Sequence, residues 1–185
     1  MELDDVVRKR QSIREYSGKK VKWKDVIAIL DAARYAPTAG HISTLRLVLV
    51  SKEEKRKKLA EAAGQEFLAF APCIIVVCSD ATQIKRSYGE RGTRYARHQA
   101  GAAIENMLLK ITDLGLSSCW IGAFDDDSIK RTLHIPDDIQ VEALLPVAYP
   151  IAETRRSRKE ELNRILYFEE WKQKAKKKIG MPEAI

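Results

Sequence analysis

Two arginines and a serine alternate near the start of the chain, in the run Arg10-Gln11-Ser12-Ile13-Arg14. Alternate residues of an extended segment project to one side, so Arg10, Ser12 and Arg14 would present two guanidinium groups and a hydroxyl in a row. This set suits a phosphate group, because arginine forms bidentate hydrogen bonds with phosphate oxygens and the hydroxyl adds a neutral donor. The alternative is a solvated basic turn, since charged runs usually face water.

Two further segments consist of small residues that would let a ligand approach the backbone closely. One is Gly122-Ala123, which is followed by three aspartates. There, backbone N–H groups could face a ligand without bulky side chains in the way. The other is a loop suited to contact with a flat ligand. It contains Pro37, Thr38, Ala39, Gly40 and His41.

A helix predicted from about Arg97 to Leu114 is the element around which these segments are arranged. It carries a broad apolar arc that includes Ile104 and Met107, and a narrow stripe of Ala102 and Leu109 nearly opposite. A helix that is apolar on two sides is predicted to be buried on two sides. The simpler interpretation is a core helix with no other role.

The segment after this helix is predicted to turn back into the core. Gly115 suits a left-handed helix end, and Ser117 to Phe124 has the pattern of a short buried strand. For Trp120 and Phe124, a position in the core is favoured over contact with a ligand, because large aromatic side chains usually pack inside.

The remaining elements follow from apolar periodicity and turn signals. Strands are predicted at 45–51, 73–79 and 139–149. Residues 80–96 are polar and contain glycines, and they are interpreted as a mobile connection or short helix that could act as a lid. Helices are predicted before Arg8, over Trp23–Tyr35 and over Lys159–Trp171. A further helix is predicted to begin at a capping box formed by Ser51 and Glu54, to run to Ala63 and to end at Gly64. A short helix is predicted to begin at Asp125–Asp127 and to run to Leu133.

The composition indicates one domain over residues 1–171 with a Lys-rich extension over 172–185, because 185 residues that are 45% hydrophobic supply one sizeable core. No run of about 18 apolar residues and no signal-peptide pattern is present, so we expect a cytoplasmic protein without a membrane span. The cysteines Cys73, Cys78 and Cys119 lack metal-ligand spacing, which predicts reduced core residues and no metal site.

The net charge of +7 is concentrated near the C-terminus, where residues 155–178 hold ten Lys or Arg and four Glu. Nucleic-acid binding would favour a basic face interleaved with aromatic residues across the fold. A nucleic-acid binder with a basic tail is therefore the less favoured alternative.

Taken together, the motifs resemble the nitroreductase family of flavoproteins over residues 2 to about 171. No single motif is specific to that family, but their order and spacing are. The motifs are R-x-S-x-R-x-Y at 10–16, A-P-T-A-G at 36–40, A-x-x-N-M-L-L followed by L-G-L-S-S-C-W-I-G-A-F within 103–124, and R-x-R at Arg156 and Arg158.

The resemblance implies an α+β fold, with a mixed, mostly antiparallel sheet flanked by helices, and an intertwined homodimer with FMN at the subunit interface. By the same resemblance, Arg14 matches a cation near the flavin pyrimidine edge. The loop 37–41 matches a partner-subunit segment beside the flavin ring, and Gly122-Ala123 matches the backbone at flavin N5. The residues that match phosphate ligands are Arg10, Ser12, Arg156 and Arg158.

The activity implied is an FMN-dependent oxidoreductase. It would pass electrons from NADH or NADPH to a small acceptor such as a nitroaromatic, quinone or enone by a ping-pong mechanism. The flavin would carry the chemistry, so no catalytic side chain is predicted. The alternatives are a specialised family member and an FMN- or anion-binding module without turnover. Here His41 stands where many members carry asparagine, and Gly64 and Phe67 stand where larger members carry Asn and Lys.

Overall fold

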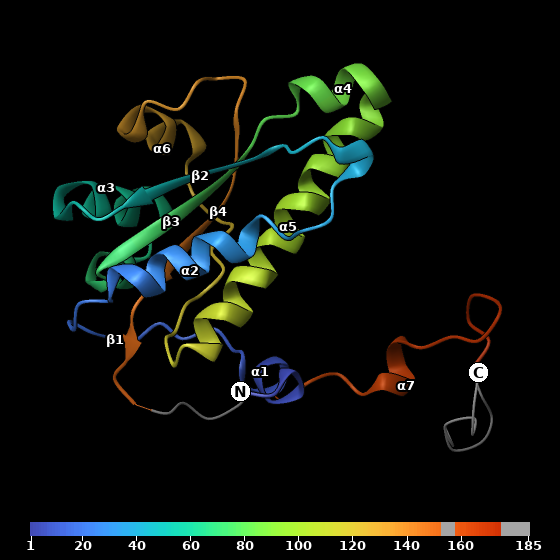
Figure 1. Cartoon of the computed structure of the whole chain (residues 1–185), viewed down its shortest axis with the longest axis horizontal. Coiled ribbons are helices and arrows are strands. Elements are labelled where there is room, and N and C mark those ends of the chain that lie inside the picture. The colour runs from blue at the N-terminus through green and yellow to red at the C-terminus, as the bar shows by residue number, and fades with distance from the viewer. Residues whose placement is uncertain (153–157, 175–185) are drawn as a thin grey trace. The chain divides into compact units, whose positions relative to one another are not determined.

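The computed structural model describes residues 1–152 and 158–174, and the chain divides into two units, 1–154 and 155–185. The N-terminal unit has three layers, with helices on both faces of a central sheet (Figure 1). In the C-terminal unit the described helix is α7 (Leu162–Ile165), much shorter than the helix predicted over 159–171. The prediction of that longer helix was wrong.

The central sheet contains β2 (Leu45–Val50), β3 (Cys73–Ser79) and β4 (Gln140–Val147), in the order β2-β3-β4 with antiparallel pairing throughout. Every residue of β3 is buried, and its β-branched composition suits a central strand. A second ladder pairs β1 (Tyr16–Ser17) with β5 (Tyr149–Pro150), also antiparallel. The three strands of the central sheet confirm the strands predicted there.

One face of the sheet packs against α2 (Trp23–Ala33) and α5 (Glu90–Asp113). Alternate side chains of β3, including Ile75 and Val77, point to this face, where they meet Ile104 of α5. The broad apolar arc predicted for this helix is buried, whereas Ala102 and Leu109 of the narrow stripe remain partly exposed in the single chain.

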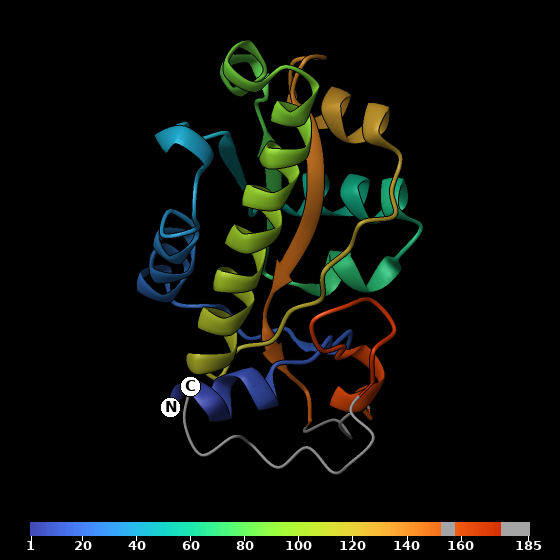
Figure 2. The same ribbon diagram turned by 90° about the vertical axis from the view of Figure 1, so that its right-hand side faces the viewer.

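The other face packs against α3 (Glu53–Ala63), the 3-10 helix η2 (Glu66–Phe70) and α6 (Asp126–Leu133) (Figure 2). Gly64 ends α3 in the left-handed conformation that was predicted, with φ of 60°. The capping box predicted at the start of α3 was wrong, because Lys52 is the N-cap residue and makes no side-chain cap bond.

Residues 80–96 form a helical corner, so the short helix, one of the two alternatives predicted for this segment, is present. Helix α4 (Thr82–Tyr88) is followed by Gly89 and then directly by α5, which begins seven residues earlier than predicted. A Cβ added at Gly92 would lie 2.7 Å from the backbone of Ile84, so the two helices meet at a position that only glycine fits.

The segment after α5 also differs from the prediction. Gly115 has φ of 70°, as expected, but Ser117–Phe124 is not a continuous strand. Its pairing consists of isolated bridges, from Ser117 to Ala148 and from Ile121 to Leu144. The segment therefore lies along β4 but leaves it before Gly122.

The three cysteines are free and buried, as predicted. Within residues 1–152 and 158–174, no cluster of three or more His, Cys, Asp or Glu side chains is placed to hold a metal ion. None of the helices in these same ranges is long and apolar enough to cross a membrane.

Candidate functional site

The segment from Arg10 to Arg14 follows α1 (Leu3–Lys9) and runs extended beside the segment that follows α5. Ser12 forms a parallel bridge with Ser118, and the Ile13 backbone N–H donates to the Ser118 carbonyl oxygen at 2.9 Å. The structure therefore joins two of the motifs identified in the sequence, although more than 100 positions separate them.

Ser12 and Arg14 are exposed, and Arg10 is half-buried. In the described part of the chain, neither Ser12 nor Arg14 has a hydrogen-bond or ion-pair partner for its side chain. Arg10 Nε lies 3.4 Å from Glu105 Oε1 on α5. This ion pair orients the guanidinium group and leaves its two terminal amino groups for a ligand.

Tyr16, the last residue of the first motif, is buried and holds this segment in place. Its hydroxyl donates to the Ile13 carbonyl oxygen at 2.6 Å, and its ring lies 6.0 Å from that of Phe67. Burial raises the pKa of the Tyr16 hydroxyl above its ordinary value, so this group remains a neutral donor. We assign Tyr16 to positioning of the Arg10–Arg14 segment.

Gly122 and Ala123 are exposed, in the turn between the Ile121 bridge and α6. A Cβ at Gly122 would have its nearest neighbour, Trp120 Nε1, at 4.0 Å, which is an ordinary contact. Packing inside the chain therefore does not require glycine here. Because both side chains are small, they leave the backbone of this exposed turn largely uncovered.

Trp120 is 43% exposed, so the position favoured for it in the core was wrong. Its indole lies against α5, where a Cβ at Gly101 would be 3.8 Å from the ring. This is an ordinary van der Waals distance, so the indole packs beside the helix at Gly101. Phe124 is partly buried and packs on the core beside α3 and α6.

The loop from Pro37 to His41 lies at the other end of α5, near α4 (Figure 1). It contains the 3-10 helix η1 (Ala39–His41), in which Gly40 and His41 both have positive φ, at 58° and 59°. A Cβ on Gly40 would lie 2.6 Å from the Tyr88 hydroxyl oxygen, so the Tyr88 side chain of α4 covers this glycine.

The two groups of predicted ligand-contacting residues therefore do not meet within one chain. Arg10 contacts α5 at Glu105, whereas Tyr88, beside Gly40, comes just before α5 begins at Glu90. The fifteen helical steps from Glu90 to Glu105 correspond to roughly 22 Å along a helix axis.

The two basic residues predicted near the C-terminus cannot be joined to either group. Arg156 lies outside the described residues. Arg158 belongs to the C-terminal unit, where its Nη2 atom lies 3.2 Å from Glu161 Oε1.

Comparison with known proteins identifies the fold and then the family. The chain is similar to the solved structure of a nitroreductase family protein from Clostridium novyi NT, with a TM-score of 0.75 and 27% identity, over 94% of this chain and 97% of the other. It is also similar to the solved structure of an FMN-dependent nitroreductase from Clostridium difficile R20291, with a TM-score of 0.77 and 26% identity, over 90% of this chain and 98% of the other. The predicted α+β fold is thereby confirmed.

The sequence profile of the Nitroreductase family matches residues 7–70 and 62–149. The chain is also 33% identical, over 146 residues, to a protein of Archaeoglobus fulgidus described as an NADH dehydrogenase/NAD(P)H nitroreductase; this match spans 76% of the chain and 81% of the relative. The chain belongs to the nitroreductase family.

Proposed function

We propose that this chain is an FMN-dependent oxidoreductase that takes electrons from NADH or NADPH. The observation that carries the proposal is the pairing of Ser12 with Ser118. It brings the Arg10–Arg14 segment beside Ser118, four positions before the exposed Gly122, which supports a common site for both segments. The relatives described as NAD(P)H nitroreductase and FMN-dependent nitroreductase support the same donor and cofactor.

The residues present fit the chemical groups of FMN. Arg10 and Arg14 carry positive charge, and the Ser12 hydroxyl adds a neutral donor, so Arg10 and Ser12 would hold the phosphate. Arg14 would lie at the pyrimidine edge of the ring. The accessible backbone at Gly122 and Ala123 would meet the ring near N5. We propose Arg156 and Arg158 as further phosphate ligands on the basis of the family resemblance alone.

FMN, when bound, supplies hydride chemistry between a reduced nicotinamide and an electron acceptor. The protein then has to hold the cofactor and keep one ring face open to small molecules. Arg14 would stabilise negative charge at the pyrimidine edge after reduction. We propose a ping-pong order, in which donor and acceptor use that open face in turn, and a nitroaromatic, quinone or enone as the acceptor.

We propose that the loop 37–41 completes the site from a second copy of the chain. This loop contacts Tyr88 of α4, just before α5 begins, whereas Arg10 contacts Glu105 in the C-terminal half of α5, so the two groups of predicted contacts lie apart in a single chain. A two-fold pair of chains would bring the loop of one copy to the arginines of the other. The homodimer is thus part of the proposed site.

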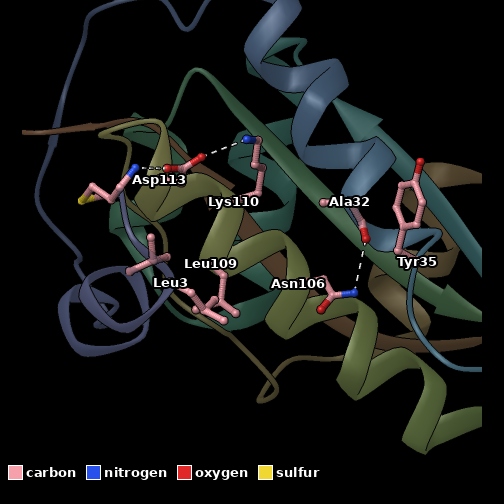
Figure 3. A pocket seen from close by; sticks show the side chains of 9 residues that line it. Leu3, Ala32, Tyr35, Asn106, Leu109, Lys110 and Asp113 are labelled. Carbon is pink, nitrogen blue, oxygen red and sulfur yellow. Dashed lines mark hydrogen bonds and ion pairs between the residues drawn. The ribbon is translucent and has the colours of Figure 1, made fainter.

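An apolar groove on α5 suits this pairing. It has a volume of about 450 Å³ and lies between α1, α2 and α5 (Figure 3). Leu3 and Leu109 lie side by side in it, and both Leu3 and Tyr35 are exposed. At one end, Asp113 contacts Lys110 and the Met1 amino group, each at 2.9 Å. Leu109 belongs to the narrow stripe of α5, whose burial we assign to the second copy.

An absorbance spectrum of the purified protein, recorded before and after addition of NADH or NADPH, tests this function. We expect a flavin band with FMN bound in the ratio of one per chain, and loss of that band on reduction. A protein that contains no flavin and binds no added FMN at micromolar concentration would contradict the proposal. Bound FMN that neither nicotinamide reduces would point instead to a binding module without turnover.

The proposal also includes one domain over residues 1–171, an extension over residues 172–185 and a cytoplasmic location. Buried free thiols at Cys73, Cys78 and Cys119 support a reducing compartment.

A further inference from the structure

The corner between α4 and α5 carries a concentration of unpaired positive charge. Lys85 and Arg86 of α4 and Arg91 and Arg94 of α5 are all exposed. Among the residues that the structure describes, none of these four side chains forms an ion pair or hydrogen bond. Between Thr82 and Ala96, Glu90 is the one acidic residue. On α3, by contrast, the two exposed cations Lys57 and Lys58 each form an ion pair with a glutamate four residues earlier.

This charge is presented on a rigid surface. The helices meet at Gly92, where no side chain fits. On a helical wheel, Arg91, Arg94 and Tyr95 share an arc of about 100°. The Tyr95 ring lies 5.3 Å from that of Tyr88, with an interplanar angle of 81°, so an edge-to-face aromatic pair stands between the arginines and the loop 37–41.

The position of this corner restricts what could bind there. Tyr88 covers Gly40, so the corner that carries these cations adjoins the loop that we propose covers the flavin ring of the other copy. A ligand that places one end at that ring and carries phosphate groups further along would reach the arginines. Reduced nicotinamide dinucleotides have this chemistry, with a ring that donates hydride and a pyrophosphate some atoms away.

We propose that Arg91 and Arg94, assisted by Lys85 and Arg86, bind the phosphates of the nicotinamide dinucleotide, and that Tyr88 and Tyr95 form an aromatic wall beside it. The inference rests on the proposed oxidoreductase function and adds the donor-binding residues to it. Arginine suits this role because its planar donor array grips phosphate oxygens, and the adjoining rings offer flat apolar contact.

The test compares two electron donors in the Arg91→Ala/Arg94→Ala double variant. For NADH and NADPH we expect KM to rise about tenfold, which corresponds to loss of about 1.4 kcal/mol of binding, with kcat changed less than about twofold. For 1-benzyl-1,4-dihydronicotinamide, which carries no phosphate, we expect the rate constant of flavin reduction to remain unchanged. Added salt should raise the KM for NADH in the unaltered enzyme more than in the variant.

The control variant is Lys20→Ala/Lys24→Ala, which removes two exposed cations that form no ion pair in the described ranges and lie before and within α2. It should change neither the KM for NADH and NADPH nor the rate constant of flavin reduction by the phosphate-free donor. The flavin content and circular dichroism of each variant establish that the fold is intact. If the arginine double variant fails to fold, Lys85→Ala/Arg86→Ala provides the same comparison on α4, with a smaller expected rise in KM.

Two results would overturn the inference. One is an unchanged KM for NADH and NADPH in the arginine double variant. If that variant instead loses affinity for an oligonucleotide, the corner binds nucleic acid and not the dinucleotide. The other is an equal loss with the phosphate-free donor, which would indicate a general defect in the site. Failure of the proposed function is distinguishable, because the unaltered protein would then show no flavin reduction by either kind of donor.

Discussion

Gln99 of α5 accepts two hydrogen bonds from Thr44, whose backbone nitrogen and Oγ1 lie 2.9 and 2.7 Å from Gln99 Oε1. Both residues are buried, with exposed fractions of 6% and 0%. Thr44 stands between the loop 37–41 and β2, so this pair fixes the point at which the loop returns to the sheet. The stability of the fold and the placement of the loop are linked through it.

Replacing Gln99 by Leu should lower the free energy of unfolding by about 1–3 kcal/mol, because two buried donors of Thr44 would lose their acceptor. Denaturant unfolding followed by circular dichroism measures this. Gln83→Leu, at an exposed position on α4, is the matched control and should change stability little. Equal losses in the two variants would contradict the role assigned to the pair.

Gly40→Ala should be more destabilising than Gly64→Ala. Both glycines have left-handed φ, near 60°, so both variants carry similar backbone strain, roughly 1–2 kcal/mol. Only at Gly40 does the new Cβ also meet the Tyr88 hydroxyl, because space at Gly64 is open. Tyr88→Phe should reduce the destabilisation caused by Gly40→Ala and should not change the destabilisation caused by Gly64→Ala. Thermal melting of the two glycine variants, each with and without Tyr88→Phe, tests this, and identical effects at the two glycines would refute it.

Arg10→Ala should weaken FMN binding by roughly 10- to 100-fold, the loss expected for a charge-assisted hydrogen bond of about 1.5–3 kcal/mol. Arg8→Ala is the control, since Arg8 is exposed on α1 and forms no ion pair in the described part of the chain. Flavin fluorescence titration gives both dissociation constants. If the two variants bind FMN equally well, Arg10 is not a phosphate ligand.

Leu109→Glu should dissociate the homodimer and, with it, release FMN, because a charge would be placed in the apolar groove of α5. Phe70→Glu alters an exposed aromatic residue of η2 that does not line that groove, and should leave the dimer intact. Sedimentation velocity, recorded with the absorbance of bound flavin, separates the outcomes. A Leu109→Glu protein that remains dimeric would place the interface elsewhere.

The buried thiols predict a loss of stability at high pH. Burial raises the pKa of Cys73 and of Cys78 from 9.0 to about 11. The unfolded chain therefore releases these protons at lower pH than the folded chain does, so the free energy of unfolding should fall as pH rises from about 9 to 11. The Cys73→Ala/Cys78→Ala variant should show a shallower fall over the same range. Equal slopes would show that other groups cause the change.

The sequence was informative wherever burial leaves a local pattern. Strand β3 could be predicted because both of its faces are covered, which requires an unbroken apolar run from Cys73 to Ser79. The start of α6 could be predicted because Asp125 accepts a hydrogen bond from the Asp127 backbone nitrogen as its N-cap. The left-handed ends at Gly64 and Gly115 follow from glycine itself.

The first two turns of α5 could not be predicted in the same way. In that part of the helix the buried residues are Gly92 and Ala96, which are small and give no apolar stripe. At Gly92 the burial comes from the close approach of α4, which is set by tertiary structure.

The candidate site was predicted in its residue types but not in its geometry. Trp120 is 43% exposed and packs beside Gly101 of α5, nineteen positions away, and an isolated aromatic residue gives no local signal of such a tertiary contact. The sequence gives no role to Tyr88 and Tyr95, because the polar pattern of their segment indicates only a mobile connection or short helix. The contact between their two rings depends on how α4 and α5 pack against each other, which is set by tertiary structure.

The placement of Ser12 and Gly40 toward opposite ends of α5 has a genetic consequence in the proposed homodimer. Consider two alleles, one defective at Ser12 and the other at Gly40. In a hybrid assembly, one centre would inherit both lesions and the other would inherit neither. Co-expression of two inactive forms should therefore restore part of the activity, so damage at the two positions would behave as recessive and complementing.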